Sequence, residues 1–464
     1  MRLDLAGLVL ALAPALVNAA DPKPAWAPAL DRELAAIADD PGYRLSGLSV
    51  LALKQGEIAY EFQHGRRRID DAEPANDRPV GPDTMFRVAS ISKLVTTLGV
   101  LRLVDAGRLD LDRDVSDYLG WRLRNPHFPD TAITLRLLLS HNSSLRDAGG
   151  YFWDRSHRLR DVLVPGGALY GGGRGTSRDP AISKSWSAEA APGRYFSYAN
   201  LPWGVIAEAM EAVTGERFDR LMKRLVLEPL GVPGGYNPAE FSRTEIVNLG
   251  TLYRKRENLP TGEEIWRDPE GRWYAQVDDL AREAPVPRAG PDYVPGTNGT
   301  LMAPQGGLRT SARGLARVMR MLVDGGRVDG KAFLAPASLD EFFRTAWVHE
   351  MAKRNGDCAS ESGRPRLFNA WGLGNQVFMD ISGPGCGDRL VEGGGFKGHG
   401  HLGEAWGLNG VFVFDRATRD GMIVLVGGVA RDPEKHPGKY SAHYRHEERL
   451  LTAIFRRAIR REGE

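Results

Sequence analysis

Strand-like segments occur at both ends of this chain, and helical segments occupy the middle. Near the N-terminus, residues 48–53 and 57–62 flank Lys54-Gln55-Gly56, a turn signal. Near the C-terminus, residues 410–414 and 422–426 flank a polar stretch in the same manner. Because each pair needs partners to bury its apolar side chains, we expect both ends to enter one antiparallel sheet.

Between these ends the apolar residues recur with helical spacing, in five segments of the sequence. The predicted fold class is therefore α/β (α+β): an antiparallel sheet built from both chain ends, flanked by helices, with a mostly helical inserted region. The sheet parts are expected at about 46–90 and 370–430, and the helical part at about 91–369. The five helical segments are 94–106, 135–139, 204–213, 218–227 and 315–322.

The remaining segments are assigned from composition. Residues 20–45 are expected to form a linker and an N-terminal helix, and 431–464 a C-terminal helix that packs on the sheet. Two long loop-like stretches, 146–192 and 234–299, interrupt the helical part. Long connections in compact domains tend to be binding loops, and disorder is the ordinary alternative.

Residues 1–19 have the pattern of an export signal. Arg2 is followed by an apolar run over 5–17 and by small residues in Val17-Asn18-Ala19. The run is too short for a transmembrane helix, and no other segment is apolar enough, so we expect an exported, periplasmic or secreted protein without a transmembrane segment. Lys and Arg number 61 against 59 Asp and Glu, so nothing favours a nucleic-acid partner.

Cys358 and Cys386 are the only cysteines of the chain. In an exported protein an even number of cysteines favours a disulfide, and two unpaired thiols are the alternative. No Cys or His spacing typical of zinc occurs, and we expect neither a metal nor a cofactor.

Ser90-Ile91-Ser92-Lys93 is the stretch that points most directly to chemistry. Ser90 and Lys93 are three residues apart at an expected helix start, so the Lys93 amine is within reach of the Ser90 oxygen. The positive end of the helix favours an oxyanion beside Ser90. Lys93 is the only lysine with a serine three positions before it, and its neighbours are apolar, which indicates a buried pair. A solvated helix face is the alternative for the spacing alone.

A second segment offers the groups that such a pair needs. In Tyr198-Ala199-Asn200 the phenol is a candidate proton relay, and the amide is a candidate hydrogen-bond partner for an acyl group or for Lys93. Tyr198 is the only tyrosine with an asparagine two positions later. Without Ser90 and Lys93, a tyrosine packed at a helix start would be the simpler interpretation.

The third segment, residues 398–408, runs into a C-terminal strand and contains His399-Gly400-His401-Leu402-Gly403-Glu404. With these three motifs the chain resembles the serine β-lactamase and penicillin-binding-protein superfamily, in the branch related to class C β-lactamases. The resemblance covers about residues 46–430 and includes further landmarks at 107–112, 133–145, 228–232 and 306–312.

This resemblance implies roles for particular residues. The implied catalytic residues are Ser90 as the nucleophile, Lys93 and Tyr198 as the proton-transfer groups, and His401. His401 is also the implied start of the strand motif, with His399 as the alternative start. Asn200, His399, Leu402 and Gly403 are implied substrate-binding residues, and the backbone N–H groups of Ser90 and Glu404 the implied oxyanion hole.

One departure concerns the substrate. The strand motif has histidine where the lactamases have lysine, which weakens the expectation of strong carboxylate binding, although Lys397 or Arg309 could supply that charge. We expect an exported serine hydrolase that forms an acyl-enzyme on Ser90 and acts on amide bonds of the β-lactam or D-amino-acid peptide type. An esterase on the same scaffold and a non-catalytic penicillin-binding or sensor homologue are the alternatives. The expected partner is a small molecule or a peptide, and the oligomeric state stays open.

Overall fold

A computed structural model describes residues 24–173, 183–261, 263–267, 271–280 and 284–461. The predicted export signal at 1–19 lies outside these residues, as do positions 20–23 of the predicted linker and 174–182 of the predicted loop at 146–192. Within the described part, no helix is both long and apolar enough to cross a membrane.

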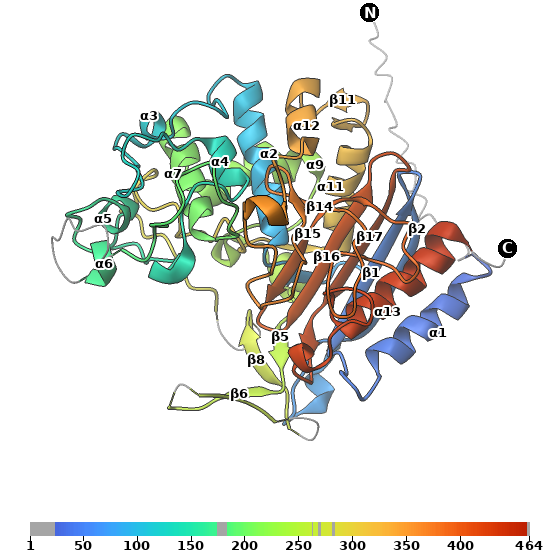
Figure 1. Cartoon of the computed structure of the whole chain (residues 1–464). Coiled ribbons are helices and arrows are strands. Elements are labelled where there is room, and N and C mark those ends of the chain that lie inside the picture. The colour runs from blue at the N-terminus through green and yellow to red at the C-terminus, as the bar shows by residue number, and fades with distance from the viewer. Residues whose placement is uncertain (1–23, 174–182, 262, 268–270, 281–283, 462–464) are drawn as a thin grey trace, which may run out of the picture.

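The two ends of the chain form one antiparallel sheet, as predicted. Figure 1 shows the N-terminal strands β1 and β2 beside the C-terminal strands β15, β16 and β17. The ends are joined by β1 and β17, whose pairing runs from Leu48 opposite Val426 to Leu53 opposite Gly421. The nine strands, in spatial order, are β12 Trp347–Val348, β13 Ala370–Trp371, β14 Gln376–Phe378, β15 Gly398–Ala405, β16 Leu408–Asp415, β17 Asp420–Val426, β1 Gly47–Lys54, β2 Glu57–Arg68 and β3 Arg78–Pro79.

Alternate residues of the central strands enter two different cores. On β1, Leu51 and Leu53 pack with α2 (Ile91–Asp105) and α11 (Ala312–Val323), whereas Val50 and Ala52 face the terminal helices. The sheet is therefore covered on both faces, which explains why β1 is buried along nearly its whole length.

The terminal helices α1 (Ala27–Ala38) and α13 (Arg445–Ile454) lie side by side on one face of the sheet (Figure 1). α1 buries Leu30, Leu34 and Ile37, which share one face of a helix. A π-helical segment, Phe455–Arg460, continues α13.

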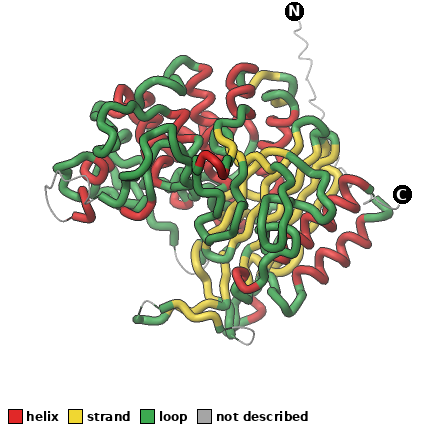
Figure 2. The backbone as a smooth tube through the Cα atoms, viewed as in Figure 1, coloured by secondary structure: helices red, strands yellow, loops and turns green. Residues whose placement is uncertain are grey.

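The opposite face carries the helical region. α2 is buried on 12 of its 15 residues, so it runs through the core between the sheet and the other helices. Figure 2 shows these helices gathered on one side of the sheet, joined by long loops. The other helices are α3 Ser116–Leu119, α4 Leu135–Leu139, α5 Leu159–Leu163, α6 Tyr170–Gly173, α7 Leu201–Thr214, α8 Phe218–Met222, the π-helical Lys223–Leu227, α9 Glu228–Leu230, α10 Arg243–Asn248 and α12 Pro336–Phe343.

The predicted helical part also contains strands that the sequence did not indicate. In the stretch 234–299, β5 (Leu252–Arg254) pairs with β8 (Tyr274–Val277) and with β18 (Gly428–Val429), next to the end of β17. These strands are too short to show a clear alternation. The remaining short strands are β4 Met85–Arg87, β6 Arg256–Asn258, β7 Glu264–Trp266, β9 Arg309–Ser311, β10 Arg327–Val328 and β11 Lys331–Ala332.

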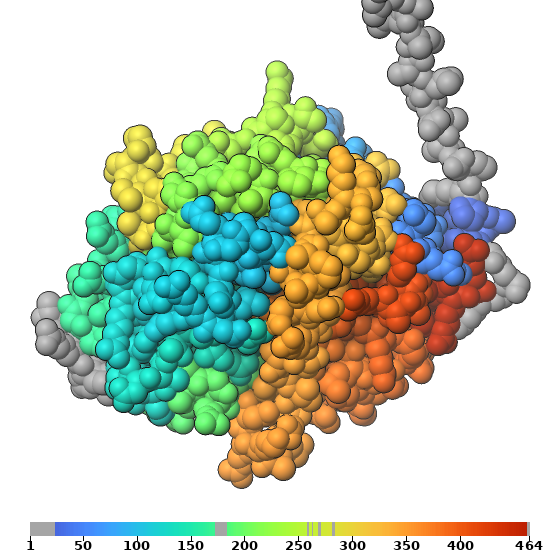
Figure 3. Space-filling model, turned by 90° about the horizontal axis from the view of Figure 1, so that it is seen from above, coloured from blue at the N-terminus to red at the C-terminus, as the bar shows by residue number. Residues whose placement is uncertain are grey.

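The chain around residue 350 runs across the surface between the two halves of the molecule. Figure 3 shows it as an orange band between the helical region, in cyan and green, and the C-terminal strands, in red. An isolated bridge between Phe196 and Gly356 ties this band to the helical region, and β12 ties it to the sheet. The segment that follows it, residues 360–364, lines a pocket.

Candidate active site

Ser90 stands directly before α2 and shortly after the end of the short strand β4. β4 pairs with β9, and the Val88 N–H donates to the Leu308 carbonyl at 2.9 Å, so residues 308–311 hold the segment that leads to Ser90. Ala89 adopts a left-handed φ of +45°, an uncommon conformation for a residue with a side chain. This bend sets Ser90 at the N-terminal end of α2, where the unpaired N–H groups favour negative charge.

Lys93 is fully buried one turn into α2, and its amine contacts Ser90. Its Nζ lies 3.0 Å from Ser90 Oγ, 2.6 Å from Asn200 Oδ1 and 3.2 Å from the Gln305 carbonyl oxygen. Burial lowers the pKa of Lys93 to about 8, although the carboxylates of Glu361 and Asp147 oppose this shift. A neutral amine would keep two donors for Asn200 and Gln305 and direct its lone pair at the Ser90 hydroxyl.

Tyr198 is held by aromatic packing beside this pair. Its ring stacks on His141, with centroids 4.5 Å apart, and on Phe368 at 5.2 Å, while Lys93 Nζ lies 4.8 Å from its centre. Burial, then the nearby Glu361 carboxylate, raise the pKa of Tyr198 well above its usual value, against a hydrogen bond with Ser90 that lowers it. The phenol therefore stays protonated and is available as a donor to a reacting group.

Asn200 connects Lys93 to two carboxylates. Its backbone N–H and its Nδ2 both donate to Asp147, which also accepts the Leu201 N–H at the start of α7. Nδ2 donates in addition to Glu361 Oε1 at 2.7 Å. Since the carboxylates bind the amide nitrogen, the amide oxygen is directed toward Lys93.

The β15 strand brings His401 to the same place. His401 is 2% exposed, with its ring 5.3 Å from that of Trp371 and 6.2 Å from that of Tyr198. Burial, then the charge of Lys93, lower the pKa of His401 to about 3, so the ring is neutral at ordinary pH. His399 lies two residues before it, packs on Phe343 and contacts Asn375, outside the pocket.

Gly403 lets β15 approach the segment before Ser90. A Cβ atom at this position would lie 2.5 Å from the Val88 carbonyl oxygen, closer than real contacts allow. β15 thus packs closely against the backbone two residues before Ser90.

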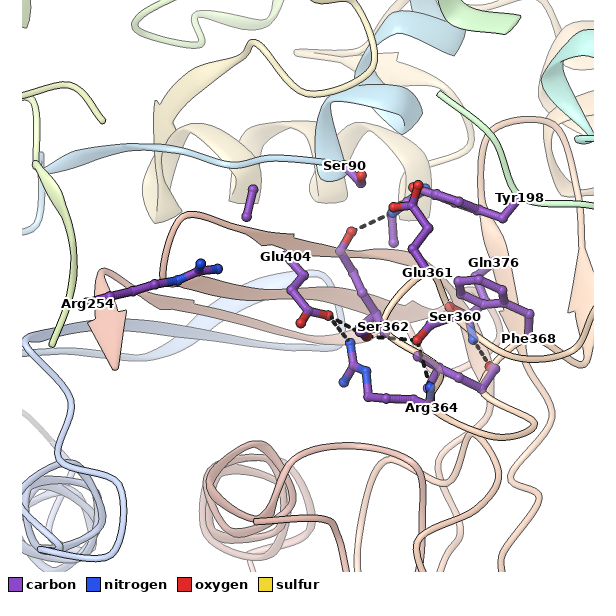
Figure 4. A pocket seen from close by; sticks show the side chains of 14 residues that line it. Ser90, Tyr198, Arg254, Ser360, Glu361, Ser362, Arg364, Phe368, Gln376 and Glu404 are labelled. Atoms are coloured by element: carbon purple, nitrogen blue, oxygen red, sulfur yellow. Dashed lines mark hydrogen bonds and ion pairs between the residues drawn. The ribbon is translucent and has the colours of Figure 1, made fainter. Parts of the chain in front are cut away.

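A pocket of about 280 Å³ opens in front of Ser90 (Figure 4). β14 pairs with Gly398, His399 and Gly400 of β15, and no strand of the described ranges pairs with this edge from His401 to Ala405, so this edge borders the pocket. The lining residues are Ser90, Tyr198, Arg254, Ser360, Glu361, Ser362, Arg364, Leu367, Phe368, Gln376, His401, Leu402, Glu404 and Ala405.

One wall of the pocket is a network of charges that reaches the C-terminal helix. Arg364 is paired with Glu404 at 2.7 Å and with Glu447 of α13 at 3.0 Å. The Tyr444 hydroxyl donates to Glu404 at 2.6 Å, and Ser362 donates to it at 3.3 Å. The network holds the loop 360–364 over the end of β15 (Figure 4).

The family of the chain follows from its match over most of its length. The model of the beta-lactamase family matches residues 30–443 of the 464. The chain belongs to the beta-lactamase family. The predicted superfamily and its fold are thereby confirmed.

Relatives of this beta-lactamase family member carry several activities in their names. It is 29% identical to esterase EstB of Burkholderia gladioli, over 55% of this chain and 68% of that protein. It is 28% identical to penicillin-binding protein 4* of Bacillus subtilis and to the D-alanyl-D-alanine-carboxypeptidase/endopeptidase AmpH of Escherichia coli K12, over 40% and 36% of this chain. The aligned part spans only 36% and 40% of the length of these two relatives.

Solved structures share the beta-lactamase fold at low identity. EstCE1, described as a hydrolase with promiscuous acyltransferase activity, superposes with a TM-score of 0.59 at 19% identity, over 93% of this chain and 98% of that one. The D-amino acid amidase of Ochrobactrum anthropi SV3 superposes with a TM-score of 0.56 at 18% identity, over 92% and 99%. At these identities the likeness concerns the fold alone.

Two predictions from the sequence disagree with the structure of this beta-lactamase family member: the disulfide, and the extra positive charge at the site. The predicted disulfide is absent: Cys358 and Cys386 are separate, half-buried thiols. The Cys358 carbonyl accepts the Phe368 N–H, whereas Cys386 closes a turn with Gly383, so different backbone contacts hold the two thiols. Arg309 does not face the pocket, because it forms a buried ion pair with Asp278, and Lys397 is exposed outside the pocket lining.

Three charged residues at the site were missed by sequence reasoning. Asp147 follows a recognised landmark but belongs to the stretch that was predicted only as a loop. Glu361 and Arg254 stand in segments without any motif. Arg254 reaches the pocket because β5 packs against the β15–β16 turn, where Gly407 has a φ of +95° and a Cβ would lie 2.2 Å from the Tyr253 carbonyl oxygen.

Proposed function

We propose that this protein is an exported serine hydrolase that forms an acyl-enzyme on Ser90 and cleaves amide bonds of the β-lactam or D-amino-acid peptide type. The observation that carries the proposal is the contact of 3.0 Å between Lys93 Nζ and Ser90 Oγ. The amine is fully buried and the serine stands at a helix N-terminus, so both the base and the oxyanion are favoured.

Acylation begins with neutral Lys93. Its lone pair accepts the Ser90 proton while Ser90 Oγ attacks the carbonyl carbon of the substrate. Because the pKa of Lys93 is lowered to about 8, a useful fraction of the amine is neutral near that pH. Asn200 and the Gln305 carbonyl keep the amine in place in either protonation state.

The oxyanion and the leaving group need different partners. The backbone N–H groups of Ser90 and Glu404 stabilise the oxyanion, a contribution of about 3–4 kcal/mol for one donor. Tyr198 stays protonated, so it gives its proton to the leaving group and is reprotonated from Lys93. In deacylation the same groups take a proton from water and return it to Ser90.

Export rests on the pattern of residues 1–19 and on the names of relatives such as AmpH and penicillin-binding protein 4*. The proposal of amide substrates is supported by the names of the same relatives and by the unpaired edge of β15. An extended peptide could pair with that edge in front of Ser90.

An esterase on the same scaffold is the second candidate. The strand motif starts with a neutral histidine, so no lysine is offered to a substrate carboxylate at this position. The alignment also covers 68% of the length of EstB, compared with 36% of penicillin-binding protein 4* and 40% of AmpH.

The test compares three substrates with purified protein: a chromogenic cephalosporin, a D-alanyl anilide and short-chain nitrophenyl esters. We expect turnover of at least one substrate and its loss in Ser90→Ala. Full turnover by Ser90→Ala would show that the nucleophile is another residue. If the wild type cleaves none of them and forms no adduct with a fluorophosphonate or a labelled penicillin, the protein is a non-catalytic homologue.

A further inference from the structure

Glu361 is the acidic side chain of the pocket that is free to meet a ligand. Four charged residues line the pocket: Arg254, Glu361, Arg364 and Glu404. Arg364 and Glu404 are bound to each other, and Glu404 also accepts hydrogen bonds from Tyr444 and Ser362. Within the described ranges, no ion pair is formed by the other two charged residues of the pocket, Glu361 and Arg254.

The Glu361 carboxylate has unused binding capacity. One of its oxygens accepts a hydrogen bond from Asn200 at 2.7 Å. Among the residues that the structure describes, no cation lies within 4 Å of it, and the residue is exposed on the pocket wall. A carboxylate accepts up to about four hydrogen bonds, so its second oxygen is available to a donor from the substrate.

Glu361 lies where the acyl group of the substrate would bind. It is bound to the amide nitrogen of Asn200, whose oxygen contacts Lys93, and its carboxylate points toward Tyr198 and Ser90 (Figure 4). Its negative charge acts on both Lys93 and Tyr198. A ligand group bound to Glu361 is therefore close to the carbonyl carbon that Ser90 attacks.

The surroundings of Ser90 do not favour an anionic acyl group. His401 is neutral, and Arg309 is used in its pair with Asp278. Arg254 enters the pocket from the side opposite Glu361 (Figure 4). The side of the pocket next to Asn200 is thus negative.

We propose that Glu361 is a specificity-determining residue that binds a protonated amine on the acyl group of the substrate. The site then prefers acyl donors derived from amino acids with a free amine, and it disfavours acyl donors that carry a carboxylate near the reacting carbonyl. This inference rests on the proposed acyl-enzyme on Ser90. A charge-assisted hydrogen bond of this kind corresponds to a preference of about tenfold to one hundredfold.

Boronic acids test the inference without a requirement for turnover, because boron bonds to the nucleophilic serine. Three compounds that differ only at the nitrogen are compared by calorimetry at neutral pH: aminoethyl, acetamidoethyl and succinamidoethyl boronic acid, which are cationic, neutral and anionic at that group. For the wild type we expect tightest binding of the amine and weakest binding of the succinyl compound.

The variant Glu361→Gln keeps an acceptor for Asn200 and removes the charge. We expect its preference for the amine over the acetamido compound to fall by at least about tenfold, whatever change the two compounds share. Glu350→Gln is the matched control, because Glu350 forms an exposed ion pair with Lys353 and does not line the pocket. This control should keep the wild-type preference.

Three results would overturn the inference. The first is equal binding of the amino and acetamido compounds by the wild type. The second is an unchanged preference in Glu361→Gln. The third is equal binding by the wild type and Ser90→Ala, which would overturn the acyl-enzyme proposal and, with it, this inference. The first two leave the acyl-enzyme proposal intact.

Discussion

Lys93 Nζ donates to Asn200 Oδ1 at 2.6 Å, although the two residues are 107 positions apart in the chain. This contact joins the first turn of α2 to the start of α7, and Ser90 lies at the junction. Lys93 and Asn200 are thus held by two different helices, and Lys93 makes its shortest hydrogen bond only where the two helix ends meet.

Replacement of Asn200 by alanine should strongly reduce turnover. The change removes the acceptor of Lys93 and leaves Asp147 and Glu361 without their shared amide donor. We expect kcat to fall by at least about tenfold on any accepted substrate. Asn237→Ala is the control, because Asn237 is a buried amide bound to Asp219 away from the pocket. Equal losses in the two variants would assign Asn200 a purely structural role.

Activity should rise with pH as Lys93 loses its proton. With a neutral ester, kcat/KM is expected to increase through a midpoint near pH 8, the pKa of Lys93. The Glu361 carboxylate raises this pKa, so Glu361→Gln should move the midpoint to lower pH. Rate profiles of the two proteins provide the comparison. If the midpoint of Glu361→Gln stays in place or moves to higher pH, the Glu361 carboxylate does not raise the pKa of Lys93.

His401 and His399 should differ in what their loss affects. His401 lines the pocket beside Tyr198, whereas His399 packs on Phe343. We expect His401→Ala to lower kcat/KM by at least about tenfold, and His399→Ala mainly to lower the free energy of unfolding, by about 1–3 kcal/mol. The measurements are steady-state kinetics and denaturant unfolding of both variants. If His399→Ala loses activity and His401→Ala mainly loses stability, the strand motif begins at His399.

Glu208 should make the protein less stable as the pH rises. Burial raises the pKa of this α7 carboxyl to about 8, so the folded state binds its proton more tightly than the unfolded chain. The resulting stabilisation is complete below pH 4.5, the ordinary value, and is lost as pH rises through about 8, at up to about 1.4 kcal/mol per pH unit.

Glu208→Gln should flatten this dependence between about pH 5 and 8, and unfolding at several pH values measures it. Part of the slope should persist, since burial also raises the pKa of Glu211 to about 7. The exposed Glu228 serves as the control position for the same substitution. A full wild-type slope in Glu208→Gln would exclude Glu208 as its source.

The sheet could be predicted because its strands carry their own signals. β1 and β2 flank a turn at Gln55 and Gly56, and β16 and β17 have the same arrangement, so the pairing of the chain ends followed from the need to bury both. The strands β5 and β8 could not be predicted, because three or four residues do not establish a period.

The sequence by itself determined the fold class and the candidate residues Ser90, Lys93 and Tyr198. The spacing of Ser90 and Lys93 on a helix is local, and Tyr198 stands in a short motif with Asn200. Only the tertiary structure decided that Asp147 and Glu361 meet at Asn200 and that Arg254 enters the same pocket. Those residues come from a 3₁₀ turn, a loop and a short strand, none of which has a local pattern of its own. Their meeting depends on how the sheet and the helical region pack, which is a property of the whole chain.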